Sequence, residues 1–226
     1  MTIPISSQST RIIIACRDAL LGGALASAAE GAGIVVAAVV DSLDGLRVTL
    51  TAPGINGIVA VDPDDFPALA VVEMAASRPV LVVGPGNDPS SMIAAVEAGA
   101  LGYADLAAPL ERLVEAAASV VDGVPVIPPL LLGSLLKHVV ERQRLHRRAL
   151  ARLEVLSARE REVFELTGRG HDRQVIADTL FISPATVRTH VQNAFRKLDL
   201  HSVAELVALA AECGLEVGPA QREESE

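Results

Sequence analysis

Residue types that start helices and residue types that end them follow one another closely in residues 157–184. This alternation constrains the fold more than any other feature of the chain. Ser157 and Glu160 have the spacing of a capping box, in which the serine hydroxyl accepts an orphan backbone N–H and the glutamate reaches back to the cap residue. Gly168 and Gly170 predict the end of this helix, because glycine takes the left-handed backbone of a C-cap without strain. A single long helix is therefore excluded here.

Three more helices are predicted after this first one. Asp172 is placed to cap a short second helix. Ser183 followed by Pro184 joins a preferred cap residue to the residue favoured at the first helical position, which predicts a third helix. Ser202 and Glu205 repeat the capping-box spacing and predict a fourth. Because so little chain separates these helices, we expect an all-α four-helix domain in which the second and third helices meet at a steep angle.

The predicted third helix has one apolar and one polar face. The apolar residues, which recur at helical spacing, are Val187, Val191, Ala194, Phe195 and Leu198. The opposite face carries Arg188, Thr189 and Gln192. Side chains of these types can hydrogen-bond base edges in the major groove of DNA. The pattern therefore favours a helix that reads double-stranded DNA, and the alternative is a generic packing module with a solvated polar face.

The segments LSAREREVFELTGRG and IADTLFISPATVRTHVQNAFRKLDLHS resemble the LuxR-type helix-turn-helix of the NarL/FixJ response regulators. The resemblance implies a bacterial transcription regulator with base contacts from Arg188, Thr189 and Gln192. The phosphate contacts that it implies fall on Arg173, Ser183, Thr186, Arg196 and Lys197. We expect a homodimer, because single recognition helices bury too little surface for tight operator binding. RNA polymerase is a candidate further partner. Val203 departs from the family pattern, because many members carry arginine there, so valine supplies neither the salt bridge nor the phosphate contact of an arginine.

Short apolar runs alternate with helical stretches through residues 11–122. The expected strands are 12–15, 34–40, 58–61, 80–83 and 102–104, and the expected helices are 19–30, one near Leu46, 67–76, 90–98 and 109–121. Alternation of this kind indicates βαβ units around a buried parallel sheet. Five units make an α/β flavodoxin-like (βα)5 domain, in which ligands bind at the carboxyl ends of the strands.

The segment AVEAGALGYADL resembles the end of a response-regulator receiver domain, and a receiver fused to this helix-turn-helix is the usual NarL/FixJ layout. By this resemblance Asp62 stands at the phosphoacceptor position. The other positions are altered: Cys16 and Arg17 replace the acid pair, Gly84 replaces the hydroxyl residue and Leu106 replaces the lysine. The resemblance therefore implies a degenerate receiver, like those of atypical or orphan response regulators.

Two hypotheses follow from the altered receiver. In the first, Arg17 pairs with Asp62, excludes Mg²⁺ and holds the aspartate as a structural carboxylate, so that DNA binding is independent of phosphorylation. In the second, a small-molecule ligand bound in the receiver-like pocket near Asp62, Gly84 and Asp105 gates the regulator.

A glycine-rich segment follows the fourth expected strand. Gly84, Gly86 and Ser90 have GxGxxxS spacing, which can cradle a phosphate on backbone N–H groups at a helix start. Glycine-rich turns of this kind are also common without any ligand, so the spacing alone carries little weight.

Pro128 and Pro129 introduce a linker helix between the two domains. The apolar stripe of this helix consists of Leu132, Leu135, Leu136, Val139 and Val140. We expect the stripe to be buried, either against the receiver-like domain or in a dimer contact, because the period does not say which surface covers it. The predicted boundaries are 11–122 for the receiver-like domain, 126–152 for the linker helix, 153–216 for the helix-turn-helix domain and 217–226 for a disordered acidic tail.

Charge is distributed unevenly along the chain. The net charge of −9 argues against a protein that coats nucleic acid. Residues 11–122 hold 14 acids against five bases, whereas residues 151–216 hold ten acids and eight bases. A DNA-binding face must therefore come from the placement of a few basic side chains.

We do not expect a membrane protein, a secreted protein, a metalloprotein or an enzyme. No apolar stretch reaches the roughly 20 residues that span a bilayer, and no secretory signal is visible, so we expect a cytoplasmic protein. Cys16 and Cys213 lack metal-ligand spacing. All five histidines lie at or beyond position 138, without a nucleophile and acid to complete a catalytic set. We expect no enzyme activity, no metal and no cofactor.

Overall fold

The structure, a computed structural model, describes residues 10–215. The chain divides into two compact units, and the division lies between His138 and Val139, inside helix α6 (Pro129–Arg152). Each unit has its own hydrophobic core. The tail predicted at 217–226 lies outside the described residues.

The N-terminal unit contains a five-stranded parallel sheet with the strand order β2-β1-β3-β4-β5. The strands are β1 (Arg11–Ala15), β2 (Val35–Val40), β3 (Gly57–Val61), β4 (Val80–Gly84) and β5 (Gly102–Asp105). Strands β3 and β4 are buried along their whole length, which explains their unbroken apolar runs. The predicted flavodoxin-like (βα)5 fold is confirmed.

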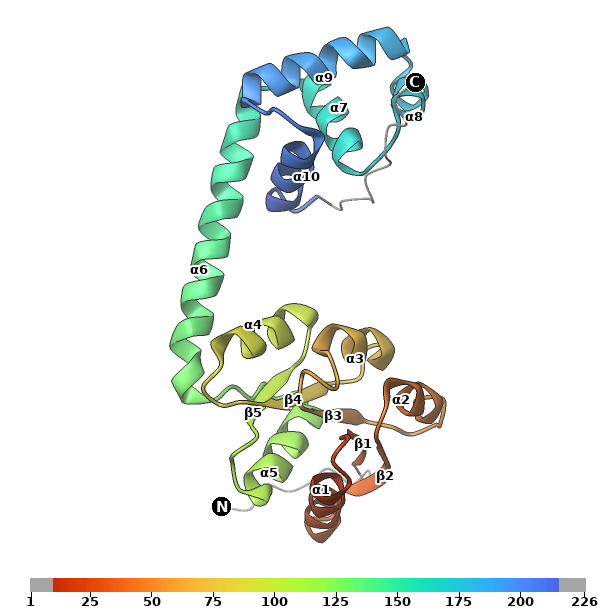
Figure 1. Ribbon diagram of the computed structural model, residues 1–226, viewed down its shortest axis with the longest axis vertical. Coiled ribbons are helices and arrows are strands. Elements are labelled where there is room, and N and C mark those ends of the chain that lie inside the picture. Colours follow the sequence, from red (N-terminus) through yellow and green to blue (C-terminus); the bar gives the residue numbers. More distant parts are fainter. Residues whose placement is uncertain (1–9, 216–226) are drawn as a thin grey trace. The chain divides into compact units, whose positions relative to one another are not determined.

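Helices cover both faces of this sheet (Figure 1). Helices α1 (Ala19–Gly31) and α5 (Leu110–Val121) lie on one face, and α2 (Leu43–Thr49), α3 (Ala68–Ala75) and α4 (Pro89–Ala98) lie on the other. Leu25 and Leu113 belong to the hydrophobic cluster of the first face, and Phe66 and Met92 to that of the second. Because the strands are parallel, their carboxyl ends meet at one edge of the sheet, where the altered receiver positions lie.

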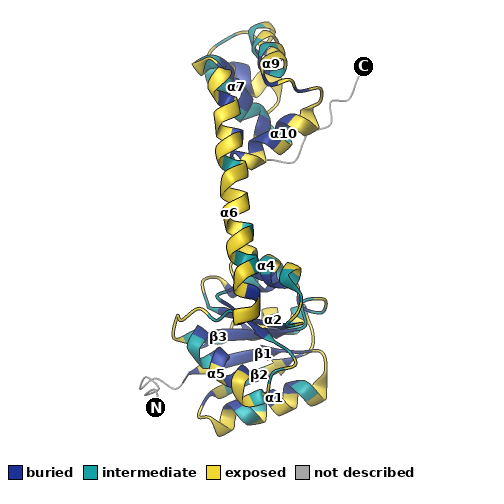
Figure 2. Cartoon of the chain, turned by 90° about the vertical axis from the view of Figure 1, so that its left-hand side faces the viewer, coloured by how far each residue is buried: buried dark blue, intermediate teal, exposed yellow. Residues whose placement is uncertain are grey.

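Helix α6 carries the apolar stripe predicted for the linker. The exposed fractions are 46, 58, 53 and 44% for Leu132, Leu136, Val139 and Val140, and most of the helix is exposed (Figure 2). The buried side of its first turns is formed instead by Leu131 and, in part, Leu135, which pack on the core of the N-terminal unit. The alternative in which the whole stripe packs on the receiver-like domain is therefore wrong, because Leu131 and only Leu135 of the predicted stripe contact that core. The alternative of a dimer contact stays a prediction. Within residues 10–215, neither α6 nor another helix is long and apolar enough to cross a membrane.

Four helices follow a single 3₁₀ turn in the described part of the C-terminal unit. These elements are η1 (Leu153–Val155), α7 (Ala158–Gly168), α8 (Arg173–Leu180), α9 (Pro184–Leu198) and α10 (Val203–Glu212). One hydrophobic cluster contains Phe164 and Leu206, and a second contains Ile176 and Val187. The predicted all-α four-helix domain is confirmed.

The predicted caps of the first three of these helices form. Ser157 and Glu160 make the reciprocal capping box at the start of α7. The Asp172 carboxylate accepts the Val175 backbone N–H at 2.8 Å, and Ser183 caps α9. Local hydrogen bonds thus fix where these helices begin, as the sequence spacing of the cap residues indicates.

Two details of the predicted caps are wrong. The Glu205 carboxylate accepts the backbone N–H of His201 at 2.9 Å and not that of Ser202, so the second capping box is incomplete. Gly170 has a left-handed backbone with φ of 82°, whereas Gly168 is the last helical residue. Gly168 is needed for close packing, because a Cβ there would lie 2.7 Å from that of Ala210.

Candidate nucleic-acid interface and receiver site

Helix α9 presents a polar face to solvent because its other side is fixed in the core. The anchoring residues, each less than 5% exposed, are Val187, Ala194 and Leu198. Arg188, Thr189 and Gln192 are exposed on the opposite side of the helix. The three side chains predicted to contact bases therefore share one accessible face.

The start of α9 adds backbone donors beside that face. Ser183 is the N-cap, and its hydroxyl accepts the Thr186 backbone N–H at 3.1 Å, with Pro184 in the first turn. The orphan N–H groups and the positive end of the helix dipole favour an anion such as a phosphate. Arg173 begins α8 and Arg196 lies in the last turn of α9, and both are exposed basic residues. Their predicted phosphate contacts stay predictions.

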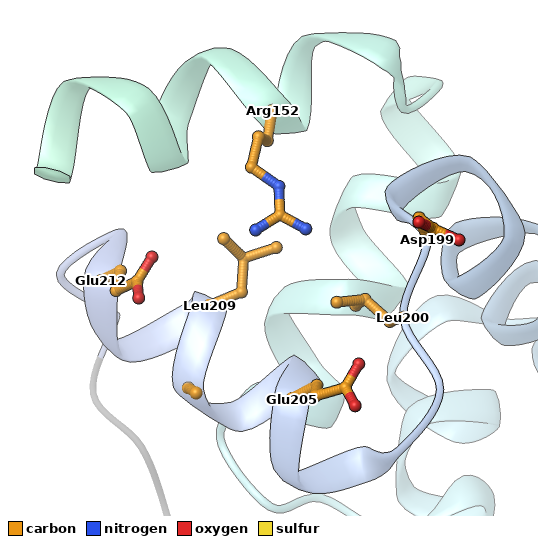
Figure 3. Close-up of a pocket in the computed structure, with 7 residues that line it drawn as sticks. Arg152, Asp199, Leu200, Glu205, Leu209 and Glu212 are labelled. Atoms are coloured by element: carbon orange, nitrogen blue, oxygen red, sulfur yellow. The ribbon is translucent and has the colours of Figure 1, made fainter.

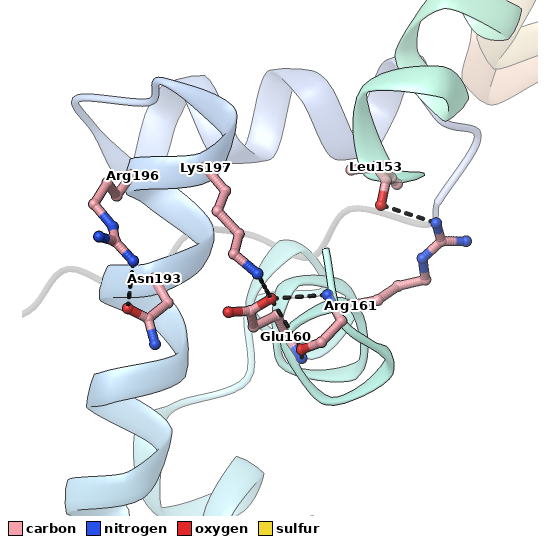
Figure 4. Close-up of polar contacts among 7 residues, drawn as sticks. Leu153, Glu160, Arg161, Asn193, Arg196 and Lys197 are labelled. Atoms are coloured by element: carbon pink, nitrogen blue, oxygen red, sulfur yellow. Dashed lines mark hydrogen bonds and ion pairs between the residues drawn. The ribbon is translucent and has the colours of Figure 1, made fainter. Parts of the chain in front are cut away.

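Lys197 is engaged inside the domain (Figure 4). Its Nζ lies 2.6 Å from Oε2 of Glu160, whose side chain is only 7% exposed. The same carboxylate accepts the Ser157 backbone N–H at 2.8 Å. The hydrogen bond from Lys197 has the largest effect on the pKa of Glu160, and the bond from the Ser157 backbone the next largest; together they lower this pKa to about 2. The ion pair joins α9 to α7, so Lys197 has a structural role in addition to the phosphate contact that was predicted for it.

Asp62, the predicted phosphoacceptor position, follows β3 directly and forms a turn. Its backbone is left-handed, with φ of 66°. Its N–H donates to the Val83 carbonyl at 2.8 Å, and its Oδ1 accepts the Asp64 N–H at 3.1 Å. Aspartate tolerates this backbone because its short side chain bonds locally. The carboxylate therefore helps to hold the β3–α3 turn.

The predicted ion pair between Arg17 and Asp62 does not form. The Arg17 Nη1 lies 2.5 Å from Oδ1 of Asp65, three residues further along the turn. The Arg17 side chain is 65% exposed, so this pairing avoids the desolvation that a buried pair would require. Cys16 is buried, and burial raises the pKa of its thiol. Across residues 10–215, no three histidine, cysteine or acidic side chains are grouped to hold a metal ion.

Tyr103 and Asp105 fill the space beside Gly84, the last residue of β4, and Gly86 in the loop after it. A Cβ at Gly84 would overlap the Tyr103 hydroxyl. Leu106, at the lysine position, packs on the cluster under α1 and α5. The Gly86 N–H donates to the Asp105 carboxylate at 3.1 Å, so it is not free to cradle a phosphate. The phosphate-cradle interpretation of this segment is therefore wrong.

Comparisons with known proteins agree with this geometry. The family model described as bacterial regulatory proteins, luxR family, matches residues 154–210. The chain is 33% identical over 131 residues to the probable transcriptional regulatory protein NarL of Mycobacterium tuberculosis, and this match spans 58% of each protein. It is 30% identical over 159 residues to the oxygen regulatory protein NreC of Staphylococcus carnosus, across 70% of each. The chain belongs to the NarL family of response regulators.

A solved structure shows the same fold as this NarL-family chain. The RcsB response regulator of Salmonella typhimurium matches with a TM-score of 0.50 at 17% sequence identity. The match covers 89% of this chain and 99% of that one. At this identity the likeness concerns the fold alone, and it agrees with a receiver-like sheet followed by a helix-turn-helix domain.

Three arginines that no sequence pattern singles out hold this NarL-family domain together. Each donates to a backbone carbonyl of another element: Arg152 to Leu198, Arg159 to Leu180 and Arg161 to Leu153. Figure 4 shows the last of these bonds. The carbonyls of Leu180 and Leu198 lie at helix C-termini, which leave such groups without a partner inside the helix, whereas the Leu153 carbonyl also accepts the Leu156 N–H at 3.1 Å. No local signal could reveal them, because the partners lie eight to 46 residues apart.

A hollow of about 230 Å³ lies between the end of α6, the α9–α10 turn and α10. Its lining includes the carboxylates of Asp199, Glu205 and Glu212 around the guanidinium of Arg152 (Figure 3). The excess of carboxylates repels phosphates. This side of the NarL-family domain is therefore unsuited to DNA, and the exposed face of α9 remains the candidate interface.

Proposed function

We propose that this protein is a homodimeric, sequence-specific regulator of transcription that reads double-stranded DNA with helix α9. The observation that carries the proposal is the exposed face of Arg188, Thr189 and Gln192 on a helix whose other side is buried. Arginine pairs with guanine and glutamine with adenine through two hydrogen bonds each, which discriminates between bases. The name of the Mycobacterium tuberculosis relative, a probable transcriptional regulatory protein, supports the same activity here.

Selection of genomic DNA fragments by the full-length protein tests this proposal. We expect a recurring motif with two half-sites about one helical turn apart, because one recognition helix buries too little surface for tight binding. Fluorescence anisotropy at physiological salt then compares the motif with a scrambled duplex of equal length. Equal affinity for the two duplexes would contradict sequence-specific readout.

We infer further that the protein works without phosphoryl transfer to Asp62. Such transfer requires Mg²⁺ to bridge the acceptor, a neighbouring acid and the phosphoryl group. Cys16 is a buried thiol and Arg17 is a cation, so neither supplies that acid. Gly84 and Leu106 supply neither a hydroxyl nor a cation to the phosphoryl oxygens. These replacements support a regulator whose DNA affinity does not depend on a phosphodonor.

Incubation with acetyl phosphate and Mg²⁺, followed by intact-mass measurement and anisotropy on the selected motif, tests this inference. We expect an unchanged mass and an unchanged affinity. The matched control omits Mg²⁺. A stable gain of one phosphoryl group, or a tightening of more than about threefold that needs both reagents, would contradict phosphorylation independence.

The exposed stripe of α6 supports the homodimer. Leu132, Leu136, Val139 and Val140 are accessible in the single chain, and a second copy would remove this apolar area from water. We expect sedimentation equilibrium to give the mass of two chains and Leu136→Glu to give that of one. Leu20→Glu is the matched control, because Leu20 is 88% exposed on α1. A Leu136→Glu protein that stays dimeric would exclude the stripe as the contact.

Gating by a small molecule has no specific observation in its favour. The pocket predicted near Asp62, Gly84 and Asp105 is occupied by the chain's own side chains, because Tyr103 lies beside Gly84 and Asp105 binds Gly86. RNA polymerase as a partner stays a prediction.

A further inference from the structure

Three hydrogen bonds tie residues 84–86, at the start of the β4–α4 loop, to the end of β5, and a fourth lies within the turn that follows β5. The Asp105 Oδ1 accepts the backbone N–H groups of Gly86 at 3.1 Å and Ala107 at 2.9 Å. The Leu106 N–H donates to the Gly84 carbonyl at 2.8 Å, and the Tyr103 hydroxyl donates to the Pro85 carbonyl at 3.1 Å. One bond between the segments, from Gly86, runs to the Asp105 carboxylate, and the Ala107 N–H holds the same oxygen from within the turn. Hydrogen bonds to a carboxylate are stronger than those between neutral groups.

Two glycines make this close approach possible. A Cβ at Gly86 would overlap the carboxylate of Asp105, and a Cβ at Gly84 would overlap the hydroxyl of Tyr103. Neither glycine has a positive φ, so the backbone conformation alone does not require glycine at either position. Glycine is therefore needed for space, to let the two side chains of β5 reach the loop.

The hydroxyl of Tyr103 is buried and stays protonated, so its hydrogen bond to the Pro85 carbonyl can persist. The whole residue is inaccessible to solvent. Burial, with smaller effects from nearby carboxylates, raises the pKa of its hydroxyl to about 12. The hydroxyl therefore remains a donor to the Pro85 carbonyl across the physiological pH range.

We propose that Asp105 and Tyr103 form a built-in clamp that holds the β4–α4 loop on β5 in one state, with the carboxylate of Asp105 taking the part of an external anion. This inference rests on the proposed phosphorylation independence and deepens it. The anion is part of the chain, so the loop is held without a phosphodonor, a metal ion or a ligand. Glycine at position 84 then does more than remove the hydroxyl residue of the family, because it also makes room for Tyr103.

Hydrogen–deuterium exchange on the full-length protein, without DNA, tests the clamp. Asp105→Ala removes the acceptor of two backbone N–H groups, so we expect exchange in peptides covering 84–90 and 106–108 to rise about tenfold or more. Asp64→Ala, which removes an exposed carboxylate from the same edge of the sheet, is the matched control and should leave those peptides unchanged.

A double-mutant comparison distinguishes the clamp from general loosening of the loop. Gly86→Ala alone should accelerate exchange of the loop, because the added methyl overlaps Asp105. In the Asp105→Ala background the atoms that it overlaps are gone, so Gly86→Ala should change exchange less than twofold. Peptides of β1, residues 11–15, report whether each variant keeps its fold.

Two results would overturn the clamp: loop exchange in Asp105→Ala within twofold of the wild type, or equal effects of Gly86→Ala in the two backgrounds. Because no DNA is present, either result is independent of whether the protein binds an operator. A clamp that holds in a protein that gains a phosphoryl group from acetyl phosphate and Mg²⁺ would instead count against the proposed phosphorylation independence alone.

Discussion

The two units of this chain differ in how their sites relate to their folds. In the C-terminal unit, the helix that Ser183 and Pro184 start also carries the exposed Arg188, so one local pattern provides both structure and candidate function. In the N-terminal unit, the parallel sheet is intact, but Gly84 and Leu106 stand at its strand ends where the family places reactive or charged groups.

This difference shows that the fold of a receiver domain does not depend on the residues that carry out phosphoryl transfer. The sheet is held by apolar strands and by the helices on its two faces, and none of its core residues needs to be a phosphoacceptor. Residues at the strand ends can therefore change while the fold remains. The changes here fill the site with the protein's own side chains, Tyr103 and Asp105.

The largest expected effect is at Arg188, on the face of α9 that is proposed to read DNA. Arg188→Ala should cost about 1–3 kcal/mol of binding to the selected motif and much less on a scrambled duplex. Fluorescence anisotropy on both duplexes measures the difference. Arg112→Ala removes the same charge from an exposed position on α5 and should leave both affinities unchanged. Equal losses on the two duplexes would make Arg188 a phosphate contact.

Lys197→Met tests whether a basic residue near the DNA-reading face serves the fold. We expect a loss of about 1–2 kcal/mol of unfolding free energy, because the largely buried Glu160 carboxylate loses a charged donor. Denaturant unfolding followed by exchange of α7 and α9 peptides measures it. Arg196→Met changes the exposed neighbour and should stay within about 0.5 kcal/mol. Unchanged stability with weaker binding to every duplex would leave Lys197 only a phosphate contact.

Acid should weaken the C-terminal unit through the same ion pair. The pKa of Glu160 is lowered to about 2, chiefly by the hydrogen bond from Lys197. A carboxyl whose pKa is lowered by folding stabilises the folded state above its ordinary pKa of 4.5 and loses that contribution as the pH falls toward 2. The stability difference between wild type and Lys197→Met should therefore shrink from pH 7 to pH 3. A constant difference would show that the carboxylate charge is not its source.

The smallest effect is expected at the phosphoacceptor position. Asp62→Asn should change unfolding free energy and motif affinity by less than about 0.5 kcal/mol, because asparagine tolerates a left-handed backbone and can still accept the Asp64 N–H. Asp62→Val is the contrasting variant and should destabilise the turn, since a β-branched residue disfavours positive φ. A threefold loss of affinity in Asp62→Asn would mean that the carboxylate takes part in regulation.

Most of the fold could be predicted because its signals are local. The apolar runs at 58–61 and 80–83 predict strands that the structure extends by one residue each. Ser157 and Asp172 form the caps that their spacing indicates. Capping bonds and helical periodicity act within about four residues, so the chain specifies them before any tertiary contact forms.

The sequence by itself determined which elements form and which face of α9 is polar, because both depend on spacing along the chain. Only the tertiary structure decided which groups meet across elements: Arg17 pairs with Asp65 and not Asp62, and Lys197 pairs with Glu160. The physical reason is that a long charged side chain has several partners within reach. Strand register, the turn after β3 and the crossing of α7 and α9 select one of them by distance and by the cost of removing charge from water.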